Sequence, residues 1–307
     1  MAFTSETSVA IILVNWNGLE FTKSCLQSLR KVDFQTFKVI LVDNGSQNQE
    51  GVTLKKAFPE IHLIENSRNL GFAGGNNVGI GFALEQGYSH VLLLNNDTEV
   101  EPDFLEEMLL KLAKNPHYGV VQPLILFLHD KKKIWSAGGK WIPTLGRAIT
   151  LGDQEPLADF RFSKTELDWA TGCCMLLTRE TIVKAGLLHD QYFTYFEDVE
   201  WSLRIKKAGY GIGLAEKAVI YHEAGASSKK THSEGILSPK VFYYHVRNQF
   251  FLIRQLGIWA GFPYHLLRFL LWMGYFMVRG RFQKLNAVAK GIRDGLFQPL
   301  KSAEKWP

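Results

Sequence analysis

Cysteine is scarce in this chain, which has three in 307 residues: Cys25, Cys173 and Cys174. Two of the three are adjacent, and adjacent cysteines rarely bridge each other, so a disulfide framework is excluded. The N-terminus also lacks a basic stretch ahead of an apolar run, and we therefore expect no signal peptide. These features together favour a protein of a reducing compartment.

Acidic residues are scarce in the last quarter of the chain. Residues 229–307 contain 13 Lys and Arg but 3 Asp and Glu, a charge of +10, whereas the rest of the chain carries −5. An acidic body suits a site that handles metal ions or other cations, and a basic, aromatic tail suits an anionic surface. A basic helical cap with its charges in solvent would have the same composition, so both interpretations stay open.

Glycine-rich phosphate loops are absent after the first apolar run, where the turn reads Asn15-Trp16-Asn17-Gly18. A dinucleotide site would place its GxGxxG motif at this turn. A sugar-nucleotide pyrophosphorylase, which is an alternative function, should carry a glycine-rich loop with a lysine here. The turn fits neither class.

The first half of the chain does contain apolar runs that alternate with helical patterns. Runs of strand length lie at residues 9–14, 37–42, 61–64 and 91–94, and helical patterns lie at 19–30, 52–58, 74–85 and 103–113. Unbroken apolar strands between helices predict a parallel sheet covered on both faces. Such sheets bind ligands beyond the carboxyl ends of their strands.

Asn and Asp follow all four of these predicted strands, at residues 15–17, 43–46, 66–77 and 95–97. Turns alone favour Asn, Asp and Gly, and a single such end would mean little. Four polar ends on one edge of a sheet predict a ligand pocket at that edge.

Seven stretches, in this order, resemble the family-2 inverting glycosyltransferases with the GT-A fold, and most of all the bacterial rhamnosyltransferase-type enzymes. They are VAIILVNWNG (9–18), VILVDNGS (39–46), ENSRNLGFAGGNNVGI (65–80), LLLNNDTEVEPDFL (92–105), TGCCMLLTRE (171–180), YFEDVEWSLRIKKAGY (195–210) and YHEAGASS (221–228). The resemblance implies an α/β GT-A fold with a mostly parallel sheet flanked by helices. It implies a catalytic domain at 1–235, with a nucleotide-binding half (1–118) and an acceptor and catalytic half (119–235), followed by a basic aromatic helical appendage at 236–307.

The resemblance also implies a nucleotide-sugar site. It places Asp43 against a pyrimidine N–H and Asn15 and Asn17 beside the base and ribose. Glycines at 71, 74 and 75 allow close backbone approach, and the helix after them would offer its N–H groups to a diphosphate. The implied donor site also includes Asn44, Gly71, Gly74, Asn76, Asn96, Asp97 and Trp201.

Asn95-Asn96-Asp97 occupies the place of the DXD metal motif in the family. The resemblance implies that Asp97 and His222 bind Mg²⁺ or Mn²⁺, which takes its remaining ligands from phosphate and water. Asn95 stands where the family has its first acidic residue. This departure lowers the local negative charge and weakens the expectation of strict metal dependence.

Residues 197–201 read Glu-Asp-Val-Glu-Trp. Inversion at an anomeric carbon needs one in-line attack by a hydroxyl that is deprotonated as it attacks, and one carboxylate supplies that. The carboxylates at 197, 198 and 200 diverge on a helix. The resemblance implies that Asp198 is the base and that Glu197 holds the acceptor or shapes the pocket. The helix macrodipole alone also favours acids at this position.

Residues 255–278 are apolar and long enough to span a bilayer, with Arg268 as their one charged residue. Pro263, three glycines and Arg268 interrupt the run. Three interpretations stay open: amphipathic helices on an anionic membrane surface, a buried or homodimer-forming appendage, and a true span. Residues 243–248 resemble a stretch common in the family at this position, which the resemblance places near the acceptor or the diphosphate.

The expected activity is transfer of a hexose or a rhamnose-like deoxyhexose, with inversion, from a dTDP- or UDP-sugar to a sugar hydroxyl. The resemblance implies a lipid-linked acceptor in surface-polysaccharide assembly, at the inner face of the plasma membrane, and no nucleic-acid partner. A degenerate sugar-nucleotide-binding protein is the alternative. Asn95 favours it, and Asp97, Asp198 and His222 together count against it.

Overall fold

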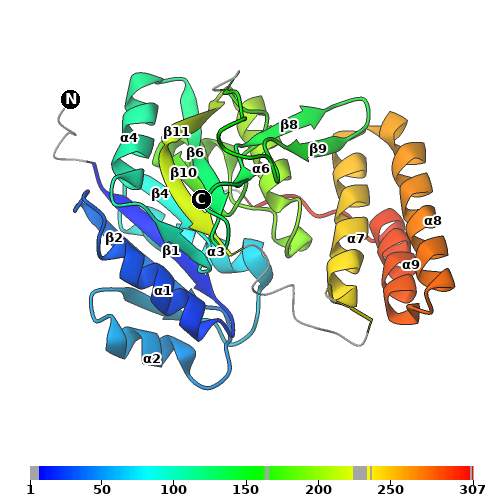
Figure 1. Ribbon diagram of the computed structural model, residues 1–307, viewed down its shortest axis with the longest axis horizontal. Helices are drawn as coiled ribbons and strands as arrows, with labels where there is room; N and C mark the ends of the chain where they lie inside the picture. The colour runs from blue at the N-terminus through cyan, green and yellow to red at the C-terminus, as the bar shows by residue number, and fades with distance from the viewer. Residues whose placement is uncertain (1–6, 163–165, 224–233, 236, 305, 307) are drawn as a thin grey trace.

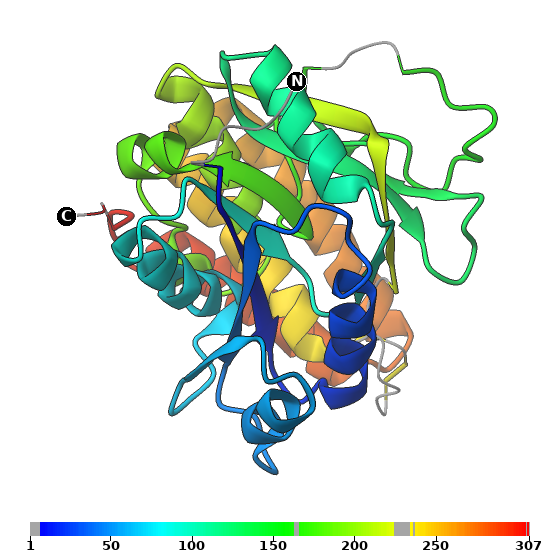
Figure 2. The ribbon, with the colours of Figure 1, turned by 90° about the vertical axis from the view of Figure 1, so that its left-hand side faces the viewer.

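The computed structural model describes residues 7–162, 166–223, 234–235, 237–304 and 306. A twisted sheet lies at the centre with helices on both faces, and three C-terminal helices form a bundle beside it (Figure 1). Seen from the side, that bundle lies behind the sheet (Figure 2). The described part of the chain therefore has the α/β architecture with a C-terminal helical unit that the sequence predicted.

One half of the sheet is parallel. It consists of β3 (His62–Glu65), β2 (Phe37–Asp43), β1 (Val9–Asn15) and β4 (His90–Leu94), in this spatial order. The register pairs Asn15 with Asp43, the last residues of β1 and β2. The polar ends of these strands therefore lie side by side, as the pattern of strand ends predicted.

The other half of the sheet is mixed. It continues from β4 through β10 (Cys174–Thr178), β6 (Tyr118–Phe127) and β11 (Gly211–His222) to β5 (Thr98–Val100), and β7 (Ile134–Ser136) pairs with β6. β10 is antiparallel to both neighbours, whereas β6 and β11 are parallel. A separate hairpin is formed by β8 (Gly139–Ile142) and β9 (Arg147–Thr150).

Alternate residues of the strands face two cores. Val9, Ile11 and Leu13 of β1 belong to the core under α1 (Leu19–Leu29), α2 (Glu50–Ala57) and α4 (Phe104–Lys114). Ala10 and Ile12 belong to the core under α3 (Gly71–Glu85), α5 (Arg179–Ala185) and α6 (Glu197–Lys207). Because both faces are covered, the strands read as unbroken apolar runs in the sequence.

The sequence underestimated three elements. β6 was missed because Gln122 and Pro123 interrupt a strand whose ten residues are all buried. β11 begins at Gly211, although the sequence shows only a short apolar run at 219–221, and a register shift between Ala215 and Val219 divides the strand. Helix α3 begins at Gly71 rather than Gly74.

The C-terminal helices are α7 (Pro239–Leu256), α8 (Phe262–Val278) and α9 (Phe282–Phe297), with a short 3₁₀ turn at Trp259–Gly261. Phe250, Phe269 and Val288 are at the centre of their shared core. The bundle also contacts the sheet domain, because Leu252 of α7 packs with Val199 of α6 in a smaller core. None of the helices in the described ranges is both long and apolar enough to cross a membrane.

Candidate active site

The carboxyl ends of β1 and β2 are tied together by a network of hydrogen bonds. Asp43 accepts from the backbone N–H of Ser46 (2.9 Å) and of Gly51 (2.7 Å). The Asn15 amide donates to Ser46 Oγ and to Glu50 Oε2, both at 3.0 Å. Asn15 is fully buried, so it shapes this edge through its neighbours, and its contact with a nucleotide stays a prediction. A carboxylate has about four acceptor positions, so Asp43 retains capacity for a base N–H.

The outer side of the same edge carries Asn17 and Asn96. Asn17 is exposed and has a left-handed backbone, with φ of 52°. Its side-chain oxygen accepts from the Gln47 N–H at 2.8 Å. Asn96 donates to Thr22 Oγ1 at 2.8 Å. The structure thus brings the predicted residues from three strand ends to one edge.

Asn44 fixes the loop that leads into α3. Its side-chain oxygen accepts from Asn66 Nδ2 and from the Leu70 N–H, both at 3.0 Å. Its amide donates to the Gly71 carbonyl at 3.0 Å. Asn44 is buried, and its hydrogen bonds set where α3 begins.

The start of α3 differs from expectation. The Gly71 N–H donates to Asn69 Oδ1 (2.7 Å), and the N–H groups of Phe72 and Ala73 both donate to the Phe193 carbonyl (2.7 and 3.3 Å). The first three N–H groups of this helix are therefore engaged within the protein, and the prediction that they face a diphosphate is corrected. A helix N-terminus binds an anion only through free N–H groups.

Glycine at position 71 is explained by close packing. A Cβ there would lie 2.5 Å from the Phe193 carbonyl oxygen, and the φ of +77° is one that side-chain-bearing residues rarely adopt. A Cβ on Gly74 would meet Leu70, and Asn76 is buried with its amide on the Phe72 carbonyl. The donor contacts implied for Gly71, Gly74 and Asn76 stay predictions.

Asp97 and His222 lie together, as the predicted metal ligands should. Asp97 Oδ1 and His222 Nε2 are 3.1 Å apart, and β11 brings His222 here by pairing with Thr98 of β5. Two neighbouring ligands of an octahedral ion with bonds of about 2.1 Å are separated by about 3 Å, so the pair fits one hard cation. Asn95 Nδ2 lies 3.5 Å from the same ring nitrogen. Among the described residues, no group of three His, Cys, Asp or Glu forms a complete protein cage.

Glu197 and Asp198 begin α6 in different surroundings. Asp198 is half-buried and accepts from the N–H of Gly172 (3.0 Å) and of Val199 (2.8 Å). Glu197 is buried, and its Oε2 has no hydrogen-bond partner in the described part of the chain. Burial raises the pKa of both carboxyls, and burial together with the charge of Asp198 raises the pKa of Glu197 well above its usual range. Two adjacent carboxylates therefore differ in the ease with which they ionise.

Glu200 faces away from this pair. It is bound by Arg204 at 2.8 Å and accepts from Gln255 of α7 at 2.9 Å. The expected divergence of the three carboxylates along α6 is confirmed, and Glu200 is neutralised by its own helix.

Trp201 was assigned to the donor site, and the structure corrects this. Its side chain is fully buried in the core under α5 and α6, and its indole N–H donates to the Gly186 carbonyl at 2.8 Å. A residue one turn along a helix from a motif can equally face the core, and the motif alone gave no signal of which face Trp201 occupies.

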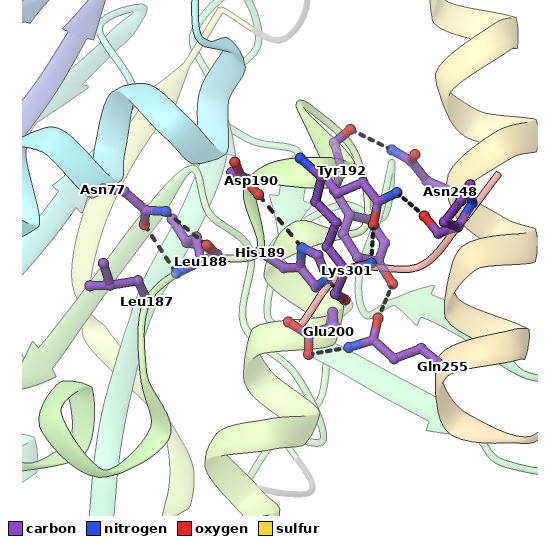
Figure 3. A network of polar contacts seen from close by, with 12 residues as sticks. Asn77, Leu187, Leu188, His189, Asp190, Tyr192, Glu200, Asn248, Gln255 and Lys301 are labelled. Carbon is purple, nitrogen blue, oxygen red and sulfur yellow. Dashed lines mark hydrogen bonds and ion pairs between the residues drawn. The ribbon is translucent and has the colours of Figure 1, made fainter. Parts of the chain in front are cut away.

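The sequence did not anticipate the contacts made by residues 186–196, the segment ahead of α6. Figure 3 shows Asn248 and Gln255 of α7 directed toward Tyr192 and Glu200. Tyr192 Oη donates to Gln255 Oε1 at 2.9 Å, and His189 Nε2 is 2.9 Å from the Lys301 carbonyl of the C-terminal segment. The stretch at 243–248 therefore contacts the loop before Glu197 and Asp198 through Asn248. Residues 224–228 of the last resembling stretch lie outside the described residues.

The chain is similar to known glycosyltransferases. Residues 10–180 match the model of glycosyl transferase family 2. The chain is 27% identical over 222 residues to the low-salt glycan biosynthesis hexosyltransferase Agl10 of Haloferax volcanii, covering 71% of this chain and 68% of that one. It is 26% identical over 256 residues to the dTDP-rhamnosyl transferase RfbF of Shigella flexneri, covering 81% of each.

A third relative is the N-acetylglucosaminyl-diphospho-decaprenol L-rhamnosyltransferase of Mycobacterium tuberculosis, at 24% identity over 71% of this chain and 77% of that one. Among solved structures, the mannosyltransferase PcManGT from Pyrobaculum calidifontis, in complex with GDP-Man and Mn²⁺, has a similar fold. It aligns with a TM-score of 0.58 at 15% identity, over 96% of this chain and 88% of that chain. The family model covers more than half of the chain, from β1 to α5, and the chain therefore belongs to glycosyl transferase family 2.

Proposed function

We propose that this glycosyltransferase moves a hexose or a rhamnose-like deoxyhexose, with inversion, from a dTDP- or UDP-sugar to a sugar hydroxyl. The observation that carries the proposal is the half-buried Asp198, held by two backbone N–H groups at the start of α6. The relatives that transfer rhamnose or hexose support the sugar class.

In the proposed reaction the acceptor oxygen attacks the anomeric carbon as the bond from that carbon to the diphosphate oxygen breaks. The acceptor proton passes to Asp198, and the nucleoside diphosphate leaves. A carboxylate whose pKa is raised by burial takes a proton more readily than an ordinary aspartate, which suits a general base. A single displacement needs no second nucleophile, in keeping with the separate orientation of Glu200.

Asp97 and His222 would hold the divalent cation, Mg²⁺ or Mn²⁺. When bound, this ion supplies positive charge that stabilises the departing diphosphate. Asn95 adds an amide beside the pair where an acid would add charge. We therefore propose metal dependence with a weaker affinity than an all-acidic motif would give.

The acceptor is proposed to be a lipid-linked glycan at the inner face of the plasma membrane. Helix α8 exposes Leu267, Leu271 and Val278 with exposed fractions of 60, 65 and 86%. It lies at the outer side of the bundle (Figure 1), and Arg279 and Arg281 follow it. An apolar helical face flanked by cations fits an anionic membrane surface. The mycobacterial relative, named for a diphospho-decaprenol acceptor, supports the lipid-linked class.

The experiment is a screen of nucleotide sugars for thermal stabilisation, with and without Mn²⁺, followed by turnover with each stabilising donor. We expect a dTDP- or UDP-sugar to raise the Tm in the presence of Mn²⁺ and to release nucleoside diphosphate when an acceptor glycan is added. Stabilisation without turnover on a panel of lipid-linked acceptors would favour the non-catalytic, sugar-nucleotide-binding alternative. Stabilisation by GDP-sugars alone would contradict the proposed donor class.

A further inference from the structure

The loop that leads into α6 has an unusual backbone. Phe193, Tyr195 and Phe196 have φ values of 66, 70 and 70°. The other positive-φ residues with side chains in the described ranges are two Asn, which favour this region, and two Gln, whereas bulky aromatic residues are rare there. Such a backbone conformation is strained and persists only where its surroundings hold it.

This backbone decides where the catalytic carboxylates point. Phe196 is the residue immediately before α6, in a left-handed conformation and without a side-chain cap. Glu197 and Asp198 are the next two residues and the first two of the helix. Any relaxation of Phe196 toward ordinary φ values would therefore reorient Asp198 relative to the Gly172 N–H.

Two adjacent side chains of α7 hold the loop. Asn248 Nδ2 lies within hydrogen-bond distance of three carbonyls of the loop, those of Tyr192 (2.9 Å), Thr194 (2.7 Å) and Tyr195 (2.8 Å). Arg247 Nη2 donates to the carbonyl of Tyr192 at 2.8 Å and to that of the preceding residue at 2.9 Å. Both side chains are more than nine-tenths buried.

The amide of Asn248 can take only one orientation here. Arg247 Nε donates to Asn248 Oδ1 at 2.9 Å, so the oxygen faces the guanidinium and the nitrogen faces the loop. A flipped amide would set an oxygen against three carbonyl oxygens. The Arg247 guanidinium therefore fixes the orientation of the buried Asn248 amide, and the two side chains act as a unit.

Aromatic contacts add to these hydrogen bonds. Phe193 stacks on Tyr244 with centroids 5.1 Å apart, and Tyr195 stacks on His245 at 4.3 Å. The Phe193 carbonyl accepts from the first turn of α3. One strained loop thus joins α7, the glycine-rich start of α3 and the catalytic end of α6.

We propose that Arg247 and Asn248 are positioning residues for catalysis, which hold the positive-φ backbone of the loop before α6 in place and so aim Asp198 at the acceptor hydroxyl. This inference rests on the proposed role of Asp198 as the base. It assigns to the C-terminal helices a part in the reaction itself, in addition to any contact with a membrane.

The test compares Asn248→Ala with Gln249→Ala, its neighbour on α7. Gln249 is equally buried and donates to a backbone carbonyl, that of Gly146 at 2.9 Å, outside the loop. Both variants should lose similar thermal stability. Asn248→Ala should lower kcat by about 10- to 100-fold, with a smaller change in donor affinity, because small displacements of a reacting group cost rates of this size.

Arg247→Lys keeps a cation that can donate to the loop carbonyls and should retain more kcat than Arg247→Ala. This second comparison tests the proposal even if Asn248→Ala does not fold. Equal kcat losses in Asn248→Ala and Gln249→Ala, or in Arg247→Lys and Arg247→Ala, would overturn the proposal. Measured beside them, Asp198→Asn must lose transfer. If it does not, the base assignment itself fails, which separates that failure from failure of the positioning role.

Discussion

At the scale of single residues, the adjacent carboxylates Glu197 and Asp198 are distinguished by what contacts them. Asp198 has two backbone N–H donors, which favour its charged form and limit the rise of its pKa. Glu197 Oε2 has no donor among the described residues, and burial and the charge of Asp198 raise its pKa well above the usual range. Burial therefore favours a neutral Glu197, whereas the donors on Asp198 favour a charged carboxylate.

We expect Glu197→Gln to retain most of the turnover, because the amide keeps the shape of the carboxyl and removes a charge that burial disfavours. In the wild type, kcat should fall on the acid side with a midpoint above the usual aspartate range, as Asp198 becomes protonated. A kinetic pH profile checks both. Loss of transfer in Glu197→Gln comparable to that in Asp198→Asn would show that Glu197 acts as an anion.

The same substitution has a stability consequence with a definite sign. A folded-state pKa raised above the unfolded value means that ionisation of Glu197 weakens folding, and this cost grows as pH rises through the folded pKa. Glu197→Gln should therefore have a higher Tm than the wild type at alkaline pH and an equal Tm below about pH 4, near the unfolded pKa. A constant difference across pH would contradict the assignment of a buried, unpaired carboxyl.

The metal pair gives a second residue-scale prediction. Asp97→Ala should weaken binding of UDP or dTDP by about tenfold or more with Mn²⁺ present, and change metal-free binding little, since it removes a ligand of the ion. Titration calorimetry checks this. Asp103→Ala, at an exposed aspartate beyond β5 and directly before α4, is the control and should bind as the wild type does. Equal losses with and without metal would mean that Asp97 touches the nucleotide or supports the fold.

The sequence predicted that Asp97 and His222 share one site, and the structure places their side chains 3.1 Å apart, while their role as metal ligands stays a prediction. It also separated Glu200 from Glu197 and Asp198. It was wrong for Trp201, because a motif residue and a core residue look alike when the buried face of the helix is unknown.

At the scale of elements, the start of α3 and the loop before α6 depend on each other through one contact. The Phe193 carbonyl accepts from two N–H groups of α3, and its oxygen would lie 2.5 Å from a Cβ on residue 71. Local sequence patterns contain no information on this contact. For that reason the sequence placed the start of α3 three residues too late and left its first N–H groups free for a diphosphate. The strands of the parallel half were predictable because burial on both faces leaves a plain apolar run.

Gly71→Ala tests this contact. Gly87→Ala is the matched control, since Gly87 has a nearly equal φ of +79° and no heavy atom within 4 Å of its would-be Cβ. Gly87→Ala should cost about 1–2 kcal/mol from the left-handed backbone alone. Gly71→Ala should cost about 1–3 kcal/mol more through overpacking against Phe193, and should also lower kcat. Denaturant unfolding measures the difference, and equal costs would show that the backbone near Phe193 yields freely.

At the scale of the whole molecule, the C-terminal helices are integrated with the catalytic part. Leu252 packs with α6, and the segment after α9 returns to residues 187–191, where Lys301 N donates to Gln191 Oε1 at 2.9 Å. Composition predicted a basic helical unit after residue 235, and the division of the chain at that point stays a prediction. The contacts that join the two parts come from residues far apart in the sequence and carry no local signal.

Point substitutions on α8 are therefore better than truncation for testing the membrane surface. Leu271→Glu combined with Val278→Glu should abolish sedimentation with anionic liposomes, and wild-type binding should fall in high salt, since each Lys or Arg near the surface contributes about 1 kcal/mol. Val183→Glu, at a valine of α5 with 45% exposure, should bind as the wild type does. If the wild type is instead a homodimer at both low and high salt, and the double variant is a monomer, this face of α8 contacts a second copy of the chain.

The central claim is a single displacement with Asp198 as base, and the anomeric configuration of the product tests it most directly. With the donor found in the nucleotide-sugar screen, proton NMR of the first product should show the configuration opposite to that of the donor. Asp198→Asn should bind that donor and lose transfer by two to four orders of magnitude. A product with retained configuration, or more than about a tenth of wild-type turnover in Asp198→Asn, would contradict the account.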